Sequence, residues 1–113
     1  MTTGTGASDV ARWVEACAVD DLDCEDLIRF DHDGHTYAIY KSPESRFYAT
    51  DGNCTHERTC LADGLVMGDV IECPKHNGRF NYKSGKGLGA PITTDLRTYR
   101  VKVEGDRVLL EIE

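Results

Sequence analysis

The 113-residue chain lacks any apolar run approaching the roughly 20 residues that a membrane-spanning helix needs, so we expect no membrane association. Positive charge is also scarce, because 13 lysines and arginines stand against 20 acidic residues, a formal net charge of −7. Nucleic acids and anionic membranes attract positive patches, and this balance argues against both as partners. It is compatible with charge-guided docking on another protein.

No segment of useful length repeats apolar residues at the 3.6-residue period of an amphipathic helix. Asp33-Gly34 lies between two short apolar stretches and predicts a tight hairpin, and Gly105-Asp106 predicts a second one. We therefore expect an all-β domain with Trp13 in its core. The expected strands cover residues 12–19, 27–30, 36–40, 47–50, 70–72, 98–103 and 108–112.

The five cysteines are an odd number, which argues against a disulfide framework. Residues 1–8 contain no basic segment followed by an apolar one, so we expect a flexible tail on a cytoplasmic protein, with residues 9–113 as one domain. We interpret Cys17 and Cys24 as small apolar residues. Cys60 is interpreted as a space-filling residue, with a functional thiol as the alternative.

Two Cys-and-His pairs are the main chemical feature of the chain. Cys54-Thr55-His56 is followed, sixteen residues later, by Cys73-Pro74-Lys75-His76. Thiolate and imidazole ligands predict a soft or borderline metal centre. Zinc is one candidate, although zinc fingers usually pair Cys with Cys and His with His. Mixed pairs suit a two-iron cluster, in which one iron takes both thiolates and the other takes both imidazoles. The remaining alternative is no metal, with isolated core cysteines.

A second group of polar residues, Asp31-His32-Asp33-Gly34-His35, could also suggest a metal site. Asp and Gly are the residues that a tight turn requires, and turn chemistry accounts for the group without a metal. We therefore interpret the two histidines here as residues that flank a hairpin turn.

The spacing Cys-X-His, sixteen residues, Cys-X-X-His resembles the Rieske [2Fe-2S] motif. Gly78-Arg79-Phe80 and Ala90-Pro91 resemble the segments that close over the cluster in that family. The resemblance extends from about Trp13 to Ile112. Within the family, the sequence is most similar to bacterial oxygenase-associated ferredoxins, including those of rhizopine catabolism.

The resemblance implies a Rieske fold, an antiparallel β-sandwich base with a loop-built cluster-binding subdomain at about residues 52–91. It implies one [2Fe-2S] cluster per chain, with residues 88–91 packed over it. Cys54 and Cys73 would hold the inner iron, and His56 and His76 would hold the more exposed iron. Asn77 stands where Gly is common in the family, and Asn tolerates the positive φ that this turn requires.

A cluster with four protein ligands has no open position for a substrate, so we expect an electron carrier and not an enzyme. The resemblance implies transfer from an NAD(P)H-dependent flavin reductase to a terminal Rieske-type oxygenase, by a monomer that docks near His56 and His76. The alternatives are a redox-sensing module or a permanent small subunit of a larger oxidoreductase. Nearby cations could steer docking or be solvated surface: Lys75, Arg79, Lys83 and Lys86.

The reduction potential can be predicted from the ligands. Two neutral imidazoles in place of two thiolates make the oxidised cluster formally neutral, which raises its potential into a window of roughly −150 to +300 mV. High-potential relatives carry a cysteine at the position of Lys75, which joins a disulfide, and hydroxyl groups at the positions of Gly78 and Phe80. Fewer hydrogen bonds stabilise the reduced cluster less. We therefore predict no bracing disulfide and a potential of about −150 mV.

Overall fold

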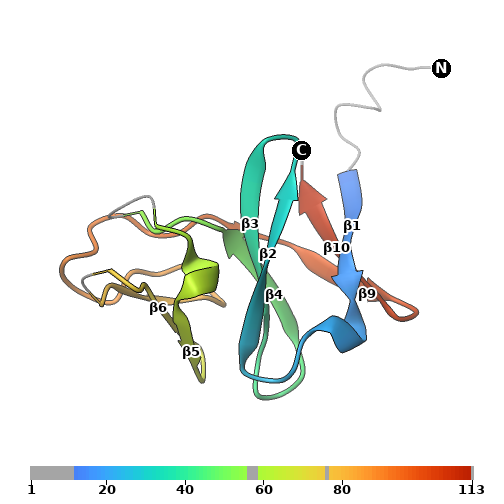
Figure 1. Ribbon diagram of the computed structural model, residues 1–113, viewed down its shortest axis with the longest axis horizontal. Coiled ribbons are helices and arrows are strands. Elements are labelled where there is room, and N and C mark those ends of the chain that lie inside the picture. The colour runs from blue at the N-terminus through green and yellow to red at the C-terminus, as the bar shows by residue number, and fades with distance from the viewer. Residues whose placement is uncertain (1–11, 56–58, 76, 113) are drawn as a thin grey trace.

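The computed structural model describes residues 12–55, 59–75 and 77–112. Within these ranges the chain forms three antiparallel sheets and no α-helix (Figure 1). No helix in the described ranges is long and apolar enough to cross a membrane. One sheet has the order β1-β10-β9, formed by Arg12–Ala18, Arg107–Ile112 and Val101–Glu104. The second has the order β2-β3-β4-β8, formed by Asp26–His32, His35–Lys41, Phe47–Asp51 and Thr98–Tyr99. The third has the order β5-β6-β7, formed by Leu65–Met67, Val70–Glu72 and Arg79–Asn81. Two 3-10 turns, η1 and η2, cover Val19–Asp21 and Leu61–Asp63.

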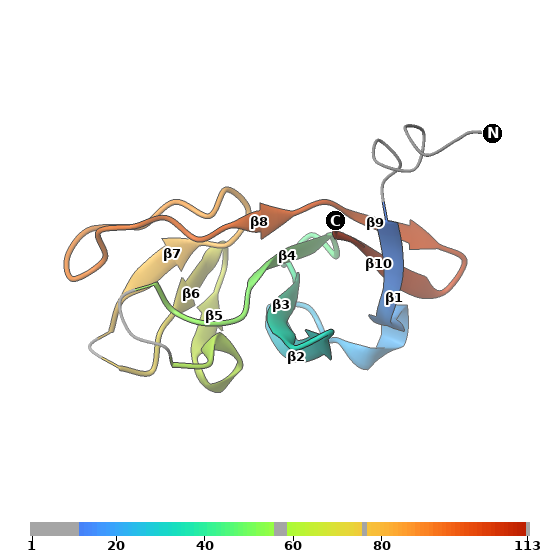
Figure 2. The same cartoon turned by 90° about the horizontal axis from the view of Figure 1, so that it is seen from above.

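The first two sheets form the base of the molecule and enclose one apolar cluster. Tyr37 and Ile39 of β3 pack there with Val108 and Leu110 of β10. The alternate residues of β3, Ala38 and Tyr40, belong to a second cluster together with residues of the third sheet. Because successive side chains of a strand point to opposite faces, β3 is buried on both sides. Figure 2 shows this arrangement, with β3 and β4 between the third sheet and the β1-β10-β9 sheet.

The predicted β2–β3 hairpin is confirmed. His32 pairs with His35, and the two residues between them have φ values of 50° for Asp33 and 78° for Gly34. Two consecutive positive φ angles are what a type I′ turn requires, and Asp-Gly adopts them readily. The histidines therefore flank a turn, as the sequence indicated.

Three sequence interpretations need correction. Trp13 is only half-buried. Val14 packs against the apolar cluster, whereas Trp13 lies on the opposite face of β1. The Lys102 Nζ is 4.4 Å from the centroid of the Trp13 ring. The strand expected at residues 98–103 is interrupted at Arg100, so that β8 pairs with β4 whereas β9 pairs with β10. Cys24 is exposed, with its Sγ 3.1 Å from the Ser45 Oγ, and is not a core residue.

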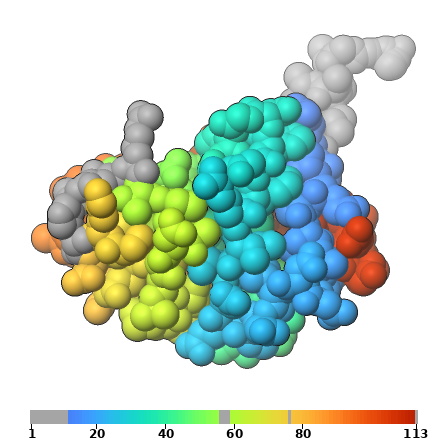
Figure 3. Space-filling model, in the orientation of Figure 1, coloured from blue at the N-terminus to red at the C-terminus, as the bar shows by residue number. Residues whose placement is uncertain are grey.

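Aromatic stacking joins the third sheet to the base. The Tyr40 and Tyr82 rings are nearly parallel, with centroids 4.5 Å apart, and both side chains are fully buried. The Tyr82 hydroxyl donates a hydrogen bond of 2.6 Å to the Gly68 carbonyl oxygen. The Glu25 carboxylate accepts a hydrogen bond of 2.6 Å from the Gly68 N–H. On the face shown in Figure 3, the yellow-green surface of the third sheet meets the blue-green surface of β2 directly.

The buried tyrosines predict a loss of stability in alkali. Burial, helped by the charge of Asp69, raises the pKa of Tyr82 to about 12. The unfolded chain releases this proton near the ordinary tyrosine pKa of about 10, so the stabilisation is complete below that pH and is lost as the pH rises toward 12. When the free energy of unfolding is measured with urea, we expect it to fall less steeply between these two pH values in Tyr82→Phe than in the wild type. Tyr48→Phe is the control, and equal slopes in both variants would refute the prediction.

Candidate metal centre

Two loops, one after β4 and one after β6, position the predicted cysteine ligands. The Cys54 N–H donates to the Thr59 carbonyl oxygen at 2.9 Å. The Cys73 N–H donates to the Gly78 carbonyl oxygen at 2.7 Å. Each of these hydrogen bonds joins a cysteine to the residue five positions further along the chain. Figures 1 and 2 place both loops at the end of the molecule far from the chain termini.

Both predicted thiol ligands are buried in one apolar cluster. Cys54 is 4% exposed and Cys73 is 1% exposed, and Leu61 and Phe80 belong to the same cluster. All five cysteines of the chain are free of disulfide bonds. Cys60 is half-buried at the start of η2, and its role stays a prediction. The structure thus brings two thiols from distant positions in the sequence to one end of the fold, as a shared metal centre requires.

His56 and His76 lie outside the described residues, so the placement of the two imidazoles stays a prediction. The donor set as a whole fits a two-iron cluster. The two buried thiols can bind one ferric ion, and each cysteine adjoins a short segment that supplies a histidine.

The turn after the second pair has the backbone conformation that the sequence predicted. Asn77 has a φ of 54°, in the left-handed region that Asn tolerates. Gly78 is buried, and a Cβ atom there would lie 2.6 Å from the Ile92 Cδ1 and 3.9 Å from the Cys73 Cβ. The absence of a side chain at position 78 therefore lets Ile92 pack close to the Cys73 loop.

A third loop, at residues 85–96, lies against the other two. The Thr55 hydroxyl donates to the Thr94 carbonyl oxygen at 2.6 Å. Ile92 is 7% exposed within the apolar cluster, whereas Leu88 is 44% exposed. The packing of residues 88–91 over the [2Fe-2S] cluster stays a prediction, and Ile92 was not singled out from the sequence. The available signal was a lone apolar residue between Pro91 and two threonines.

Ion pairs already engage two of the four cations proposed to steer docking. The Arg79 Nε is 2.9 Å from a Glu72 carboxylate oxygen. The Lys83 Nζ is 3.1 Å from Glu44 and 3.0 Å from Asp69, and so ties the base to the third sheet. Lys75 and Lys86 are exposed. Arg79 and Lys83 therefore stabilise the fold through these ion pairs, and a steering role for the four cations stays a prediction.

Comparison with known proteins relates the chain to a family. The Rieske [2Fe-2S] domain family matches residues 12–100. The chain is 42% identical over 101 residues to the ferredoxin component of the naphthalene 1,2-dioxygenase/salicylate 5-hydroxylase systems of a Ralstonia species, covering 89% of this chain and 96% of that protein. It is 33% identical over 100 residues to the biphenyl dioxygenase ferredoxin subunit of Pseudomonas sp. (strain KKS102), covering 88% and 91%.

Solved structures agree with these relatives. The complex of reduced oxygenase and oxidised ferredoxin in carbazole 1,9a-dioxygenase contains a chain that superposes with a TM-score of 0.83 at 35% identity, over 88% of this chain and 92% of that one. The ferredoxin of Sphingomonas yanoikuyae B1 gives a TM-score of 0.84 at 26% identity, over 90% and 100%. Where the name of one of these relatives specifies an enzyme system, that system includes a dioxygenase. The finer resemblance to rhizopine-catabolism ferredoxins therefore stays a prediction.

Proposed function

The chain belongs to the Rieske [2Fe-2S] family, and from that premise we propose that it carries single electrons from an NAD(P)H-dependent flavin reductase to the terminal oxygenase of an aromatic-ring dioxygenase system. Membership confirms the expected Rieske fold, the [2Fe-2S] cofactor and the role of an electron-transfer ferredoxin in place of an enzyme. The observation that carries the proposal is the pair of buried thiols, Cys54 and Cys73, in one apolar cluster.

We propose that Cys54 and Cys73 hold the inner iron and that His56 and His76 hold the outer one. When bound, the cluster supplies reversible one-electron transfer. Burial of the two thiols supports their assignment to the inner iron. The outer iron would then be the point of electron entry and exit, and the partners would dock around the two histidines.

We also propose that residues 52–91, approximately, form the cluster-binding subdomain. The third sheet and both cysteine loops fall within this range, and hydrogen bonds, stacking and the Lys83 ion pairs attach it to the base. The protein is proposed to be a cytoplasmic monomer. Five cysteines free of disulfide bonds support a reducing compartment.

Reconstituted turnover tests the proposed function. With a cognate reductase, NADH and a terminal oxygenase from a neighbouring gene, we expect substrate hydroxylation to depend on this protein and to saturate with its concentration. The cluster-free protein is the control. If the cluster is intact yet no oxygenase turnover depends on the protein with any cognate reductase, the carrier role is wrong.

One observation favours the permanent-subunit alternative. Leu65 and Met67 lie on the edge strand β5 and are 56% and 38% exposed, which would suit a fixed contact with another subunit. Purification separates the two roles: a carrier elutes as a monomer, whereas a permanent subunit co-purifies with its larger enzyme in stoichiometric amounts.

A further inference from the structure

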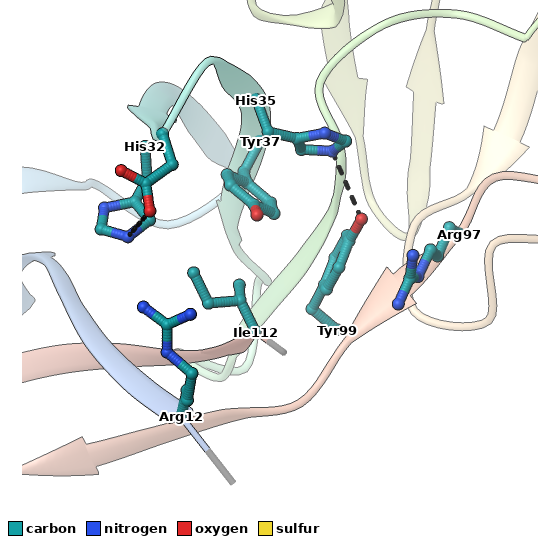
Figure 4. Close-up of a pocket in the computed structure, with 8 residues that line it drawn as sticks. Arg12, His32, His35, Tyr37, Arg97, Tyr99 and Ile112 are labelled. Carbon is teal, nitrogen blue, oxygen red and sulfur yellow. Dashed lines mark hydrogen bonds and ion pairs between the residues drawn. The ribbon is translucent and has the colours of Figure 1, made fainter. Parts of the chain in front are cut away.

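A cavity of about 290 Å³ opens between the two sheets of the base. Arg12 and Ile112 line it from the β1-β10-β9 sheet, and His32, Tyr37 and Tyr99 line it from the β2-β3-β4-β8 sheet. Figure 4 shows Arg12 reaching from β1 toward the β2–β3 hairpin, with Ile112 and Tyr37 facing the same space. Among the described residues, none between positions 52 and 91 lines the cavity, so it is separate from the described part of the proposed metal centre.

Two arginines, Arg12 and Arg97, contribute positive charge to the cavity wall. Neither Arg12 nor Arg97 has an ion-pair partner among the residues that the structure describes; Arg97 instead packs over the Tyr99 ring, with its guanidinium carbon 5.0 Å from the ring centroid. Two carboxylates, Asp51 and Asp33, also act on this region. Asp51 accepts hydrogen bonds from the Tyr99 hydroxyl and the His35 Nε2, and Asp33 lies 3.3 Å from the His32 Nε2.

Both guanidinium charges affect the Tyr37 hydroxyl inside the cavity. The pKa of the Tyr37 hydroxyl is raised, by burial first and then by the charges of Asp51 and Asp33, while Arg97 and Arg12 each act to lower it. Arg12 lies on β1 and Arg97 directly precedes β8 of the other sheet, so the fold places both cations on the wall of the cavity that Tyr37 also lines.

A buried nitrogen of the cavity wall also lacks a partner. The His32 Nε2 is buried and has no hydrogen-bond partner within the described part of the chain, because its contact with Asp33 does not meet hydrogen-bond geometry. A buried polar atom without a hydrogen bond destabilises the folded state, and a bound polar group would remove that cost.

The remaining walls are apolar and aromatic. Ile112 is 7% exposed and Tyr37 is 6% exposed, and the Tyr37 and Tyr99 rings meet edge to face with centroids 5.0 Å apart. The volume lies near the lower limit of small-molecule sites, roughly 300 Å³. A ligand that fits would thus be small, with one polar end and a compact apolar body.

We propose that this cavity binds a small organic monocarboxylate, whose carboxylate pairs with Arg12 and whose apolar body lies against Ile112 and Tyr37. A guanidinium presents parallel N–H donors that match the two oxygens of a carboxylate. The Asp33 carboxylate at the rim disfavours anions of higher charge, such as inorganic phosphate. The two arginines disfavour a metal cation, even though two histidines are close.

Titration calorimetry with benzoate as the probe, on the full chain with its cluster, tests the proposal. We expect saturable binding with one benzoate per chain. Arg12→Gln should weaken it at least about tenfold, because a bidentate charged pair is lost, and Arg97→Gln about threefold. Arg100→Gln is the matched control, since Arg100 is an exposed arginine outside the cavity, and should bind as the wild type does.

Three results would overturn the proposal: no saturable benzoate binding below about 10 mM, equal binding by Arg12→Gln and Arg100→Gln, or phosphate binding as tight as that of benzoate. The uncharged amide, benzamide, should not bind. An unchanged cluster absorption spectrum in each variant verifies that it is folded. The proposal does not depend on the carrier function, so the reconstitution assay and this titration can fail separately.

Discussion

Replacing either Cys54 or Cys73 with serine is expected to abolish the [2Fe-2S] cluster, whereas Cys60→Ser is expected to retain it. The two proposed ligands are 4% and 1% exposed within one apolar cluster, and a neutral serine hydroxyl there cannot replace a thiolate on ferric iron. We expect iron to fall from two atoms per chain to below about a tenth of that value. The purified variants should be colourless and give no electron paramagnetic resonance signal after reduction.

Cys60→Ser is a demanding control because Cys60 lies in the same loop as Cys54. Position 60 forms a β-bridge with Asn53, the residue before the proposed ligand, so the substitution disturbs the same local backbone. If only the proposed ligands matter, this neighbour keeps its full iron content. Loss of the cluster in Cys60→Ser, or a full cluster in Cys73→Ser, would contradict the ligand assignment.

Folding must be measured separately, because a bound cluster stabilises a small domain. Circular dichroism of the variants should still show β-structure, since the base has its own apolar cluster between two sheets, which includes Ile39, Val108 and Leu110. A folded but colourless Cys54→Ser protein separates loss of a ligand from loss of the fold.

Local features of the fold could be predicted from the sequence because each rests on a few adjacent residues. Asp33-Gly34 specifies its hairpin through the φ angles that these residues tolerate, and Asn77 adopts a positive φ for the same reason. Cys54 and Cys73 were predicted as soft metal ligands from their spacing, and the structure buries both.

The errors concern relations between distant segments. Alternation at residues 98–103 indicates which side chains share a face, but it does not show that the chain changes sheets at Arg100. Trp13 is apolar enough for a core, yet its position on β1 faces away from the second sheet. The arginine-lined cavity could not be predicted for the same reason, since Arg12 and Arg97 are 85 positions apart (97 − 12 = 85) and line one cavity only because the two sheets pack together.

Gly78→Ser combined with Ile92→Val is expected to raise the reduction potential from the predicted value of about −150 mV by roughly 50–100 mV. A serine hydroxyl at this position could donate a hydrogen bond toward the cluster, which is worth more in the reduced, more negative state. Serine alone does not fit, because its Cβ would lie 2.6 Å from the Ile92 Cδ1. Ile92→Val removes that atom and leaves the Cγ1 at 3.2 Å, a contact that a small shift can relieve.

Protein-film voltammetry on the double variant, with Gly78→Ala/Ile92→Val as the control, measures the effect of the hydroxyl alone. The control has the same backbone restriction and nearly the same volume but no donor, so its potential should stay close to that of the wild type. Equal potentials in the serine and alanine variants would show that no hydrogen bond forms. A wild-type potential above zero would contradict the premise itself, because a centre without hydroxyl donors at Gly78 and Phe80 should lie at the low end of the Rieske range.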